Sequence, residues 1–145
     1  MKNKKKIVVV GGGFAGLELV KRLGNATDYQ VVVVDSNNYN FFPPLIYQVS
    51  TGFMEPSAIN YQFRKILRKF KNAGIRLCSL EKVVPEENKV ILSNGEMEYD
   101  ILVMANGTAT NFFGNKNIKQ ENLTMITISE GLSGRHKIIS MLCAP

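Results

Sequence analysis

The chain has 145 residues, of which 45% are hydrophobic and 21% are charged. This length suits one domain with a hydrophobic core, and this composition excludes an intrinsically disordered chain. The formal net charge of +6 comes largely from two basic clusters: Lys2, Lys4, Lys5 and Lys6, and then Arg64, Lys65, Arg68, Lys69 and Lys71. We interpret both clusters as solvated surface and expect no nucleic-acid partner, while contact of the second cluster with an anionic membrane surface stays open.

Cysteine spacing and hydropathy exclude further classes of protein. Cys78 and Cys143 lie far apart in the sequence and form no CxxC pair, so neither a disulfide framework nor a metal site is expected. Residues 7–10 are too short for the apolar core of a signal peptide. No apolar stretch reaches the roughly 18–20 residues that a membrane-spanning helix needs. We therefore expect a cytoplasmic protein.

The start of the chain has the pattern of a βαβ unit. Residues 7–10 form a short β-branched apolar run, which is typical of a strand buried on both faces of a parallel sheet. Residues 14–23 have apolar side chains at helical spacing, and Gly24 and Asn25 follow as a helix stop. A second β-branched run covers residues 31–34. The unit has the expected length of about 30 residues.

The next part of the chain predicts a long loop and one helix. Residues 36–51 hold several aromatic and proline residues, and a connection of this length inside a compact domain is usually functional. Residues 55–73 begin with Glu-Pro-Ser, a helix start, and continue with apolar side chains at helical spacing. The pattern therefore predicts a single helix after the loop.

Further strands complete the predicted α/β fold. We expect strands at residues 75–80 and 101–105, and a hairpin over residues 90–99 around an Asn-Gly turn. A short strand is expected at residues 126–128 and a last helix at residues 129–142. The sequence thus predicts a Rossmann-like α/β domain, in which helices cover a parallel sheet that carries a small antiparallel β insertion.

A glycine-rich turn joins the first strand to the first helix: Gly11-Gly12-Gly13-Phe14-Ala15-Gly16. It matches the G-x-G-x-x-G pattern, in which backbone N–H groups and the positive end of a helix dipole bind a pyrophosphate. A side chain at Gly11 would block the turn, one at Gly13 the phosphate, and one at Gly16 the packing of the helix. Asp35 follows Gly16 by 19 residues and is placed to accept hydrogen bonds from ribose hydroxyls. The pattern predicts a dinucleotide, but NAD and FAD share it.

Segments further along the chain resemble those of known flavoproteins. Residues 99–108, Tyr-Asp-Ile-Leu-Val-Met-Ala-Asn-Gly-Thr, resemble the second FAD motif of pyridine-nucleotide-dependent flavoprotein reductases, although Asn106 stands where that family usually has Thr. Residues 38–49 resemble the loop that follows the second strand of type II NADH:quinone dehydrogenases. Asn40 and Pro43 depart from that family, which commonly has His and Gln there. The resemblance covers nearly the whole chain.

The resemblance implies the FAD-binding portion of a type II NADH:quinone dehydrogenase, within the FAD-dependent pyridine nucleotide-disulfide oxidoreductase superfamily. In that family a hydride passes from NADH to FAD, and two electrons then pass to a quinone. The resemblance and the glycine pattern together predict these FAD contacts: Gly11, Gly13, Phe14, Ala15, Gly16, Asp35, Ser36, Asn37, Pro44, Leu45, Leu80, Ala105 and Gly107. No catalytic residue and no metal ligand is predicted.

Members of the resembled family are much longer and hold an NADH domain, a quinone site and C-terminal anchors that keep them at the inner face of the membrane. We expect these parts to be absent from residues 1–145, so that this partial FAD-binding domain meets NADH and quinone only in a longer protein and does not complete turnover alone. Two alternatives stay open: a truncated, non-catalytic nucleotide-binding domain that self-associates through uncovered apolar surface, and an NAD-binding dehydrogenase domain. Asp35 disfavours NADP, because a carboxylate repels a 2′-phosphate.

Overall fold

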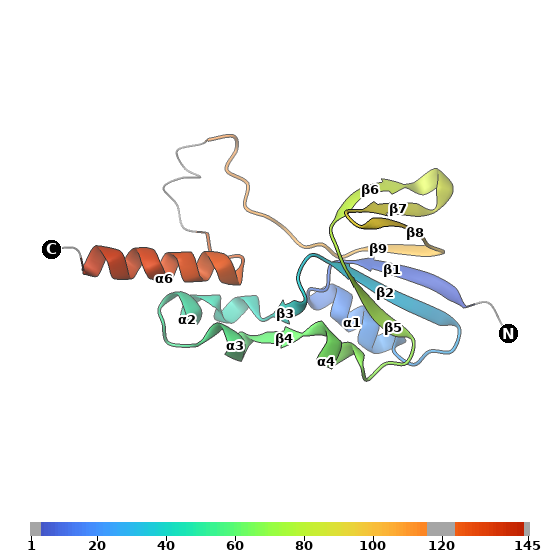
Figure 1. Cartoon of the computed structure of the whole chain (residues 1–145), viewed down its shortest axis with the longest axis horizontal. Helices are drawn as coiled ribbons and strands as arrows, with labels where there is room; N and C mark the ends of the chain where they lie inside the picture. Colours follow the sequence, from blue (N-terminus) through green and yellow to red (C-terminus); the bar gives the residue numbers. More distant parts are fainter. Residues whose placement is uncertain (1–3, 116–123, 144–145) are drawn as a thin grey trace. The chain divides into compact units, whose positions relative to one another are not determined.

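The computed structural model describes residues 4–115 and 124–143, and the chain divides into two compact units (Figure 1). Unit 1 comprises Met1–Asn40 and Tyr61–Gly107, and unit 2 comprises Phe41–Asn60 and Thr108–Pro145. The first glycine turn and Asp35 therefore both belong to unit 1.

A four-stranded sheet forms the centre of unit 1, in the order β5-β2-β1-β9. Its strands are β1 (Lys5–Val10), β2 (Tyr29–Asp35), β5 (Ala73–Leu77) and β9 (Ile101–Met104). Every neighbouring pair of strands is parallel, so the carboxyl ends of all the strands lie at the same edge. The predicted parallel sheet is confirmed.

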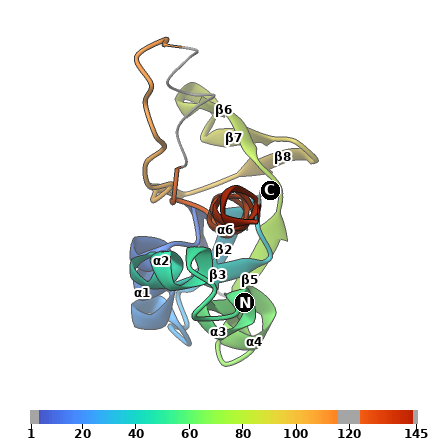
Figure 2. The ribbon, with the colours of Figure 1, turned by 90° about the vertical axis from the view of Figure 1, so that its left-hand side faces the viewer.

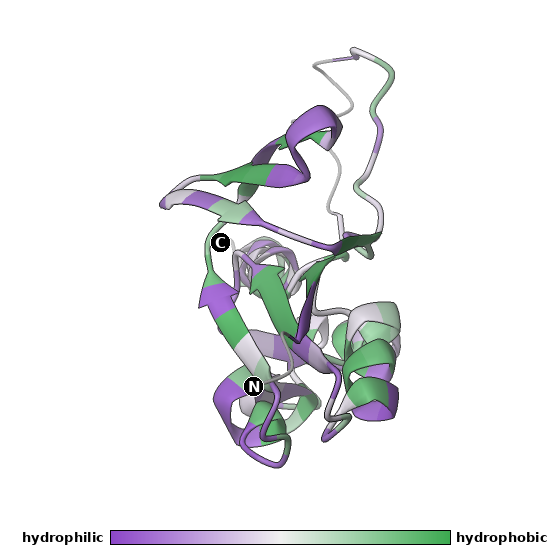
Figure 3. Cartoon of the chain, turned by 90° about the vertical axis from the view of Figure 1, so that its right-hand side faces the viewer, coloured by the Kyte–Doolittle hydropathy of each residue, from purple (hydrophilic) through white to green (hydrophobic). Residues whose placement is uncertain are grey.

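Both faces of this sheet are covered, because successive side chains of a strand point to opposite faces. The helices of unit 1 are α1 (Phe14–Leu23) and α4 (Phe63–Leu67). Ile7 and Val9 of β1 pack into a core with side chains of these helices. Val8 and Val10 pack into a second core with side chains of an antiparallel sheet. Figure 3 shows the resulting hydrophobic colouring along the parallel strands, which explains the continuous apolar run in β1.

The antiparallel sheet of unit 1 has the order β6-β7-β8. Its strands are β6 (Leu80–Val84), β7 (Lys89–Leu92) and β8 (Gly95–Glu98), and the 3-10 helix η2 (Pro85–Glu87) joins the first two. The predicted hairpin is confirmed. The predicted single strand at residues 75–80 is wrong, because the chain leaves the parallel sheet after Leu77 and joins β7 from Leu80 onward.

The predicted helix at residues 55–73 is also wrong in its extent. The segment forms α3 (Pro56–Ile59), then β4 (Asn60–Gln62), which pairs with β3 (Tyr39–Phe41), and then α4. The backbone of Asn60 is extended, with φ −112° and ψ 145°. The Phe63 N–H donates to the Asn38 carbonyl oxygen at 3.1 Å. Hydrogen bonds to a distant segment therefore replace those that a continuous helix would make. The basic side chains that follow β4 are exposed, as predicted.

Unit 2 is built on the contact between α2 (Ile46–Ser50) and α6 (Ile128–Leu142), which lie side by side in Figures 1 and 2. A Cβ at Gly131 would lie 3.1 Å from atoms of both Ile46 and Ser50, so a small residue allows this approach.

The predicted loop at residues 36–51 is a loop only in part, because this segment also forms β3, η1 (Pro43–Leu45) and α2. In the described part of the chain, no helix has the length and apolar character needed to cross a membrane.

The start of α6 is a capping box, and no strand forms at residues 126–128. The Thr127 hydroxyl accepts from the Glu130 N–H at 3.2 Å, and the Glu130 carboxylate accepts from the N–H groups of Ile126 and Thr127 at 2.9 Å. Hydrogen bonds hold the pKa of Glu130 below its ordinary value, and the bond with the Thr124 hydroxyl has the largest effect. The cap therefore stabilises α6 at neutral pH, and this contribution is lost as the pH falls through the lowered pKa.

Asn72 is a buried polar residue that joins the end of α1 to the start of β2. Its Nδ2 donates to the carbonyl oxygens of Leu23, Ala26 and Tyr29 at 2.9–3.2 Å. Its Oδ1 accepts from the N–H of Asn25 at 2.7 Å. Asn25, with φ 69°, is the left-handed residue of the predicted helix stop. One side chain thus bonds to backbone groups of four residues of this turn.

Replacing Asn72 by alanine should lower the free energy of unfolding by about 1–3 kcal/mol, because buried backbone groups lose their partner. Urea denaturation followed by circular dichroism measures this change. Asn38→Ala is the matched control, because the Asn38 side chain is exposed, and it should change the free energy by less than about 0.5 kcal/mol. Equal stability of the two variants would contradict the assigned role of Asn72.

Candidate functional site

A cavity of about 350 Å³ opens at the carboxyl edge of the parallel sheet in unit 1. We call it the strand-end cavity, and it is lined by Val10, Gly11, Val34, Asp35, Ser36, Asn37, Cys78, Ser79, Leu80, Met104 and Asn106. Ligands of open α/β sheets bind at this edge. The structure therefore brings five of the predicted contacts together around one cavity, namely Gly11, Asp35, Ser36, Asn37 and Leu80.

The other predicted contacts lie in three places. Gly13 caps α1, and the helix begins with Phe14, Ala15 and Gly16. Ala105 and Gly107 lie in the turn after β9 in unit 1. Pro44 and Leu45 belong to η1 of unit 2, and their contact with a cofactor stays a prediction.

Gly11 allows the backbone of the turn after β1 to contact the backbone of the turn after β9. Its φ is 97°, in the left-handed region that favours glycine. A Cβ at this position would overlap the carbonyl group of Ala105. The Ala105 N–H donates to the Val10 carbonyl oxygen at 2.7 Å, which extends the pairing of β1 with β9. Both the conformation and the contact therefore need glycine at position 11, as the sequence predicted for the turn.

The other two glycines of the pattern have different surroundings. A Cβ at Gly16 would overlap the Gly11 carbonyl oxygen and lie 3.4 Å from Cγ1 of Val9, so glycine there permits close packing of α1. Gly13 has φ −69°, which any residue adopts, and no atom lies within 4 Å of its Cβ position. The space beside Gly13 is therefore open, as the predicted approach of a phosphate requires.

Asp35 is half-buried at the end of β2, where it joins the glycine turn to the cavity. Its Oδ2 accepts from the Gly12 N–H at 2.7 Å, and its Oδ1 accepts from the Asn37 N–H at 2.8 Å. These bonds fix the orientation of the carboxylate. Each oxygen of an ionised carboxylate can accept more than one hydrogen bond, so Asp35 can still accept from the hydroxyl groups of a ligand.

Sequence reasoning gave Gly12 no role, although the structure gives it one. A Cβ at Gly12 would overlap the Phe63 ring and lie 3.2 Å from Oδ2 of Asp35. Phe63 is only 1% exposed and belongs to the core on the helical face of the sheet. The middle position of the triple glycine thus lets α4 pack against the turn. The signal in the sequence was a glycine at the variable second position of the G-x-G-x-x-G pattern, which does not itself require glycine there.

Asn40 is a second residue whose role only the structure reveals. It is half-buried, and its Nδ2 donates to the Gly12 carbonyl oxygen at 2.9 Å. This bond ties the segment after β2 to the glycine turn. In the sequence, Asn40 is recognisable only as a departure from the His of the resembled family.

Replacing Gly12 by alanine should lower the free energy of unfolding by about 1–3 kcal/mol, because the new Cβ overpacks the core beside Phe63. Phe63→Leu removes the ring atoms that this Cβ would overlap. The double variant should therefore be more stable than the sum of the two single effects predicts. Chemical denaturation of the four proteins measures the coupling, and strictly additive effects would contradict the contact.

Cys78 lines the cavity and has a shifted pKa. Burial raises the pKa of its thiol above the ordinary value, and the positive charge of Arg76 acts in the opposite direction. A thiol with a raised pKa is a poor nucleophile at neutral pH. Within residues 4–115 and 124–143, no group of three or more His, Cys, Asp and Glu side chains could hold a metal ion.

Comparison with known proteins gives the family and its relatives. A family model described as pyridine nucleotide-disulphide oxidoreductase matches residues 5–137. The type II NADH:quinone oxidoreductase NdhA of Mycobacterium tuberculosis is 30% identical over 140 residues, which cover 94% of this chain and 30% of that protein. The mitochondrial external alternative NAD(P)H-ubiquinone oxidoreductase B2 of Arabidopsis thaliana is 34% identical over 121 residues, which cover 76% of this chain and 21% of that protein. The chain thus spans less than a third of the length of these relatives.

Solved structures agree with the predicted fold class. NDH2 from Plasmodium falciparum, in complex with NADH, matches with a TM-score of 0.87 at 21% identity, over 97% of this chain and 30% of that chain. The sulfide:quinone oxidoreductase of Aquifex aeolicus matches with a TM-score of 0.85 at 27% identity, over 97% of this chain and 33% of that chain. The predicted Rossmann-like α/β fold with a small antiparallel insertion is therefore confirmed.

Proposed function

Because the chain belongs to the pyridine nucleotide-disulphide oxidoreductase family, we propose that it is the FAD-binding portion of a flavoprotein NADH:quinone oxidoreductase. The observation that carries the proposal is the strand-end cavity, where the glycine turn, Asp35 and Leu80 converge. Similarity to type II NADH:quinone oxidoreductases over 94% of the chain supports this branch of the family.

The residues around the cavity fit the adenosine diphosphate part of FAD. The diphosphate would accept hydrogen bonds from backbone N–H groups of the glycine turn and lie at the positive end of the α1 dipole. The open space beside Gly13 would admit it. Asp35 would accept hydrogen bonds from the ribose hydroxyls, with Ser36 and Asn37 beside it, and the backbone near Leu80 would face adenine.

The turn after β9 fits the flavin side of the diphosphate. Gly107 has φ 69°, and no atom lies within 4 Å of its Cβ position. Ala105 is held against Gly11, so this turn lies next to the first one. Asn106 lines the cavity, where its side-chain amide offers donors to a phosphate oxygen. We assign Ala105 and Gly107 to this contact and, by resemblance, Pro44 and Leu45 to the flavin.

Bound FAD would supply the two-electron chemistry between NADH and quinone, while the protein supplies binding, orientation and electrostatics. The described residues of this chain are assigned to binding and orientation. We propose that NADH and quinone bind to parts of a longer protein beyond residues 1–145, and that membrane attachment also belongs to that longer protein.

Gly13 gives the direct test of the phosphate position. Gly13→Val should lower the affinity for FAD at least about tenfold, because the side chain fills the space meant for the phosphate. Isothermal titration of the purified chain measures this affinity. Gly74→Val is the matched control, because Gly74 also has no atom within 4 Å of its Cβ position but lies in β5, away from the cavity lining. Unchanged FAD affinity in the Gly13 variant would contradict the proposed site.

The hydrogen bond from Asn40 should strengthen FAD binding, because it orients the Gly12 peptide. Asn40→Asp replaces the donor by an acceptor, so it should weaken FAD binding more than Asn40→Ala does. The alanine variant should lose about fivefold, which corresponds to one neutral hydrogen bond. Asn40→His offers an N–H donor again and should restore part of the loss. The same titration measures the FAD affinity of all three variants. An equal decrease of the affinity in all three would show that the hydrogen bond from Asn40 does not contribute to FAD binding.

A further inference from the structure

Cys78, Ser79 and Leu80 form one wall of the strand-end cavity, where the chain passes from the parallel to the antiparallel sheet. The Cys78 N–H donates to the Asp35 carbonyl oxygen at 2.9 Å, which continues the parallel pairing. Ser79 instead bonds to the hairpin: its N–H donates to Ser93 Oγ at 3.1 Å, and its carbonyl oxygen accepts from the Ser93 N–H at 3.0 Å. The position of this wall therefore depends on the turn between β7 and β8.

Arg76 of β5 holds that turn with three hydrogen bonds. Its Nε donates to Asn94 Oδ1 at 3.0 Å, its Nη2 to the Asn94 carbonyl oxygen at 2.8 Å, and its Nη1 to the Glu96 carbonyl oxygen at 3.1 Å. Asn94 Nδ2 donates back to the Leu77 carbonyl oxygen at 3.3 Å. A Cβ at Gly95 would lie 3.1 Å from Nη2, so glycine there admits the guanidinium. The planar fork of arginine fixes such a geometry, and a lysine could not reproduce it.

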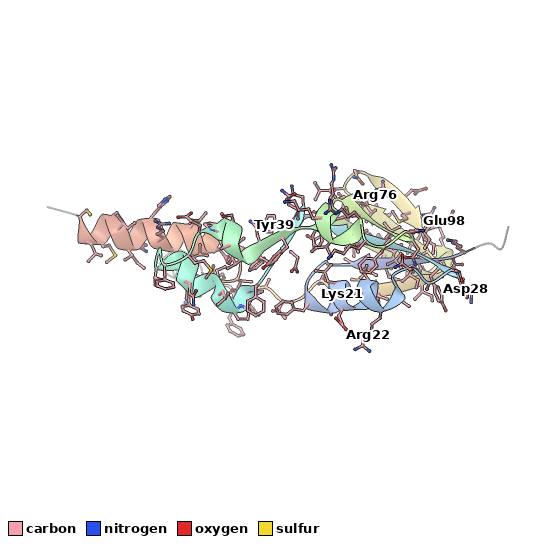
Figure 4. The ribbon with its side chains drawn as sticks, turned by 90° about the horizontal axis from the view of Figure 1, so that it is seen from below. Lys21, Arg22, Asp28, Tyr39, Arg76 and Glu98 are labelled. Carbon is pink, nitrogen blue, oxygen red and sulfur yellow. The ribbon has the colours of Figure 1, made fainter. Side chains whose placement is uncertain are left out.

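Arg76 acts from behind the wall and does not line the cavity. It is half-buried, and Figure 4 shows it on the side of unit 1 away from Lys21 and Arg22 of α1. Its hydrogen-bond partners are amide and carbonyl oxygens of one turn. The contacts run from Arg76 through Asn94 and Ser93 to Ser79, which lines the cavity.

We propose that Arg76, through the turn of residues 93–96, is a positioning residue for the adenosine half of the bound dinucleotide. It holds the wall of residues 78–80 beside Asp35, so that an adenine base fits against the wall while the ribose reaches the carboxylate. This inference rests on the proposed function, because Arg76 can position an adenosine group only if the cavity binds a dinucleotide.

The rate at which a reagent labels the Cys78 thiol measures how accessible the wall is, and this measurement needs no bound ligand. The residue is 7% exposed, and the Arg76 charge lowers the thiol pKa against the larger effect of burial. Removing that charge would raise the pKa further and slow the reaction with a thiol reagent, because the thiolate is the reactive form. Faster labelling of Cys78 in a variant without Arg76 can therefore come only from greater access.

The experiment compares Arg76→Met and Asn94→Ala with Arg22→Met in a Cys143→Ser background, which leaves Cys78 as the only thiol. Asn94→Ala keeps the guanidinium charge and removes one acceptor and one donor of the network. Arg22→Met is the matched control, because Arg22 is exposed and bonds only to Glu18 in the described structure. Labelling with an aromatic disulfide reagent should be about tenfold faster in the first two variants and unchanged in the control.

Ligand binding gives the second readout. The dissociation constants of FAD and of ADP should both rise about tenfold in Arg76→Met, because both ligands contain the adenosine half and a tenfold change corresponds to about one charge-assisted hydrogen bond. Arg76→Lys keeps the positive charge but lacks the planar guanidinium fork. Its dissociation constants should therefore lie between those of the wild type and those of the methionine variant. Thermal denaturation of each variant verifies that it is folded at the temperature of the assay, and Asn94→Ala carries the test if the arginine variants do not fold.

Faster labelling of Cys78 together with weaker binding of FAD and ADP supports the proposal. Unchanged labelling and unchanged affinities in folded Asn94→Ala and Arg76→Met, in a chain that binds FAD, overturn this proposal and leave the proposed function intact. A wild-type chain that binds neither FAD nor ADP overturns the proposed function, and the role of Arg76 toward adenosine is overturned with it.

Discussion

The close approach of the backbone at Gly11 to the backbone after β9 is the constraint on which unit 1 depends. The Gly11 N–H donates to the Val34 carbonyl oxygen at 2.8 Å, and the missing Cβ of Gly11 leaves room for the Ala105 carbonyl. The missing Cβ of Gly16 in turn leaves room for the Gly11 carbonyl oxygen. One residue thus sets the distances among β2, β9 and α1. Any side chain at position 11 would meet both a left-handed φ of 97° and a backbone overlap.

The site follows from this packing, because the same glycine turn that lets the elements approach also leaves polar groups at the carboxyl edge of the sheet. Asp35 holds the Gly12 N–H from one side, and Asn40 holds the Gly12 carbonyl oxygen from the other. Phe63 lies against Gly12, so the core of unit 1 supports the turn directly. Stability and binding are therefore coupled at Gly12, whereas Gly13 faces open space and is available for a ligand.

Local patterns predicted the elements whose structure is decided locally. The β-branched runs of β1 and β2, the glycine turn, α1 and the Asn-Gly hairpin all follow from short stretches of sequence. The predicted helix at residues 55–73 failed, because the backbone of β4 bonds to β3, and no helical periodicity reveals such a long-range pairing. The roles of Gly12, Asn40 and Arg76 were missed for the same reason, since each depends on a residue far away in the sequence.

We propose that the strand-end cavity binds the adenosine diphosphate part of FAD. A titration of the purified 145-residue chain with FAD and with NADH, followed by displacement of FAD with ADP, tests this proposal. We expect FAD to bind and ADP to displace it, because ADP competes for the same cavity. Tight binding of NADH without any binding of FAD would show that the cavity is not an FAD site.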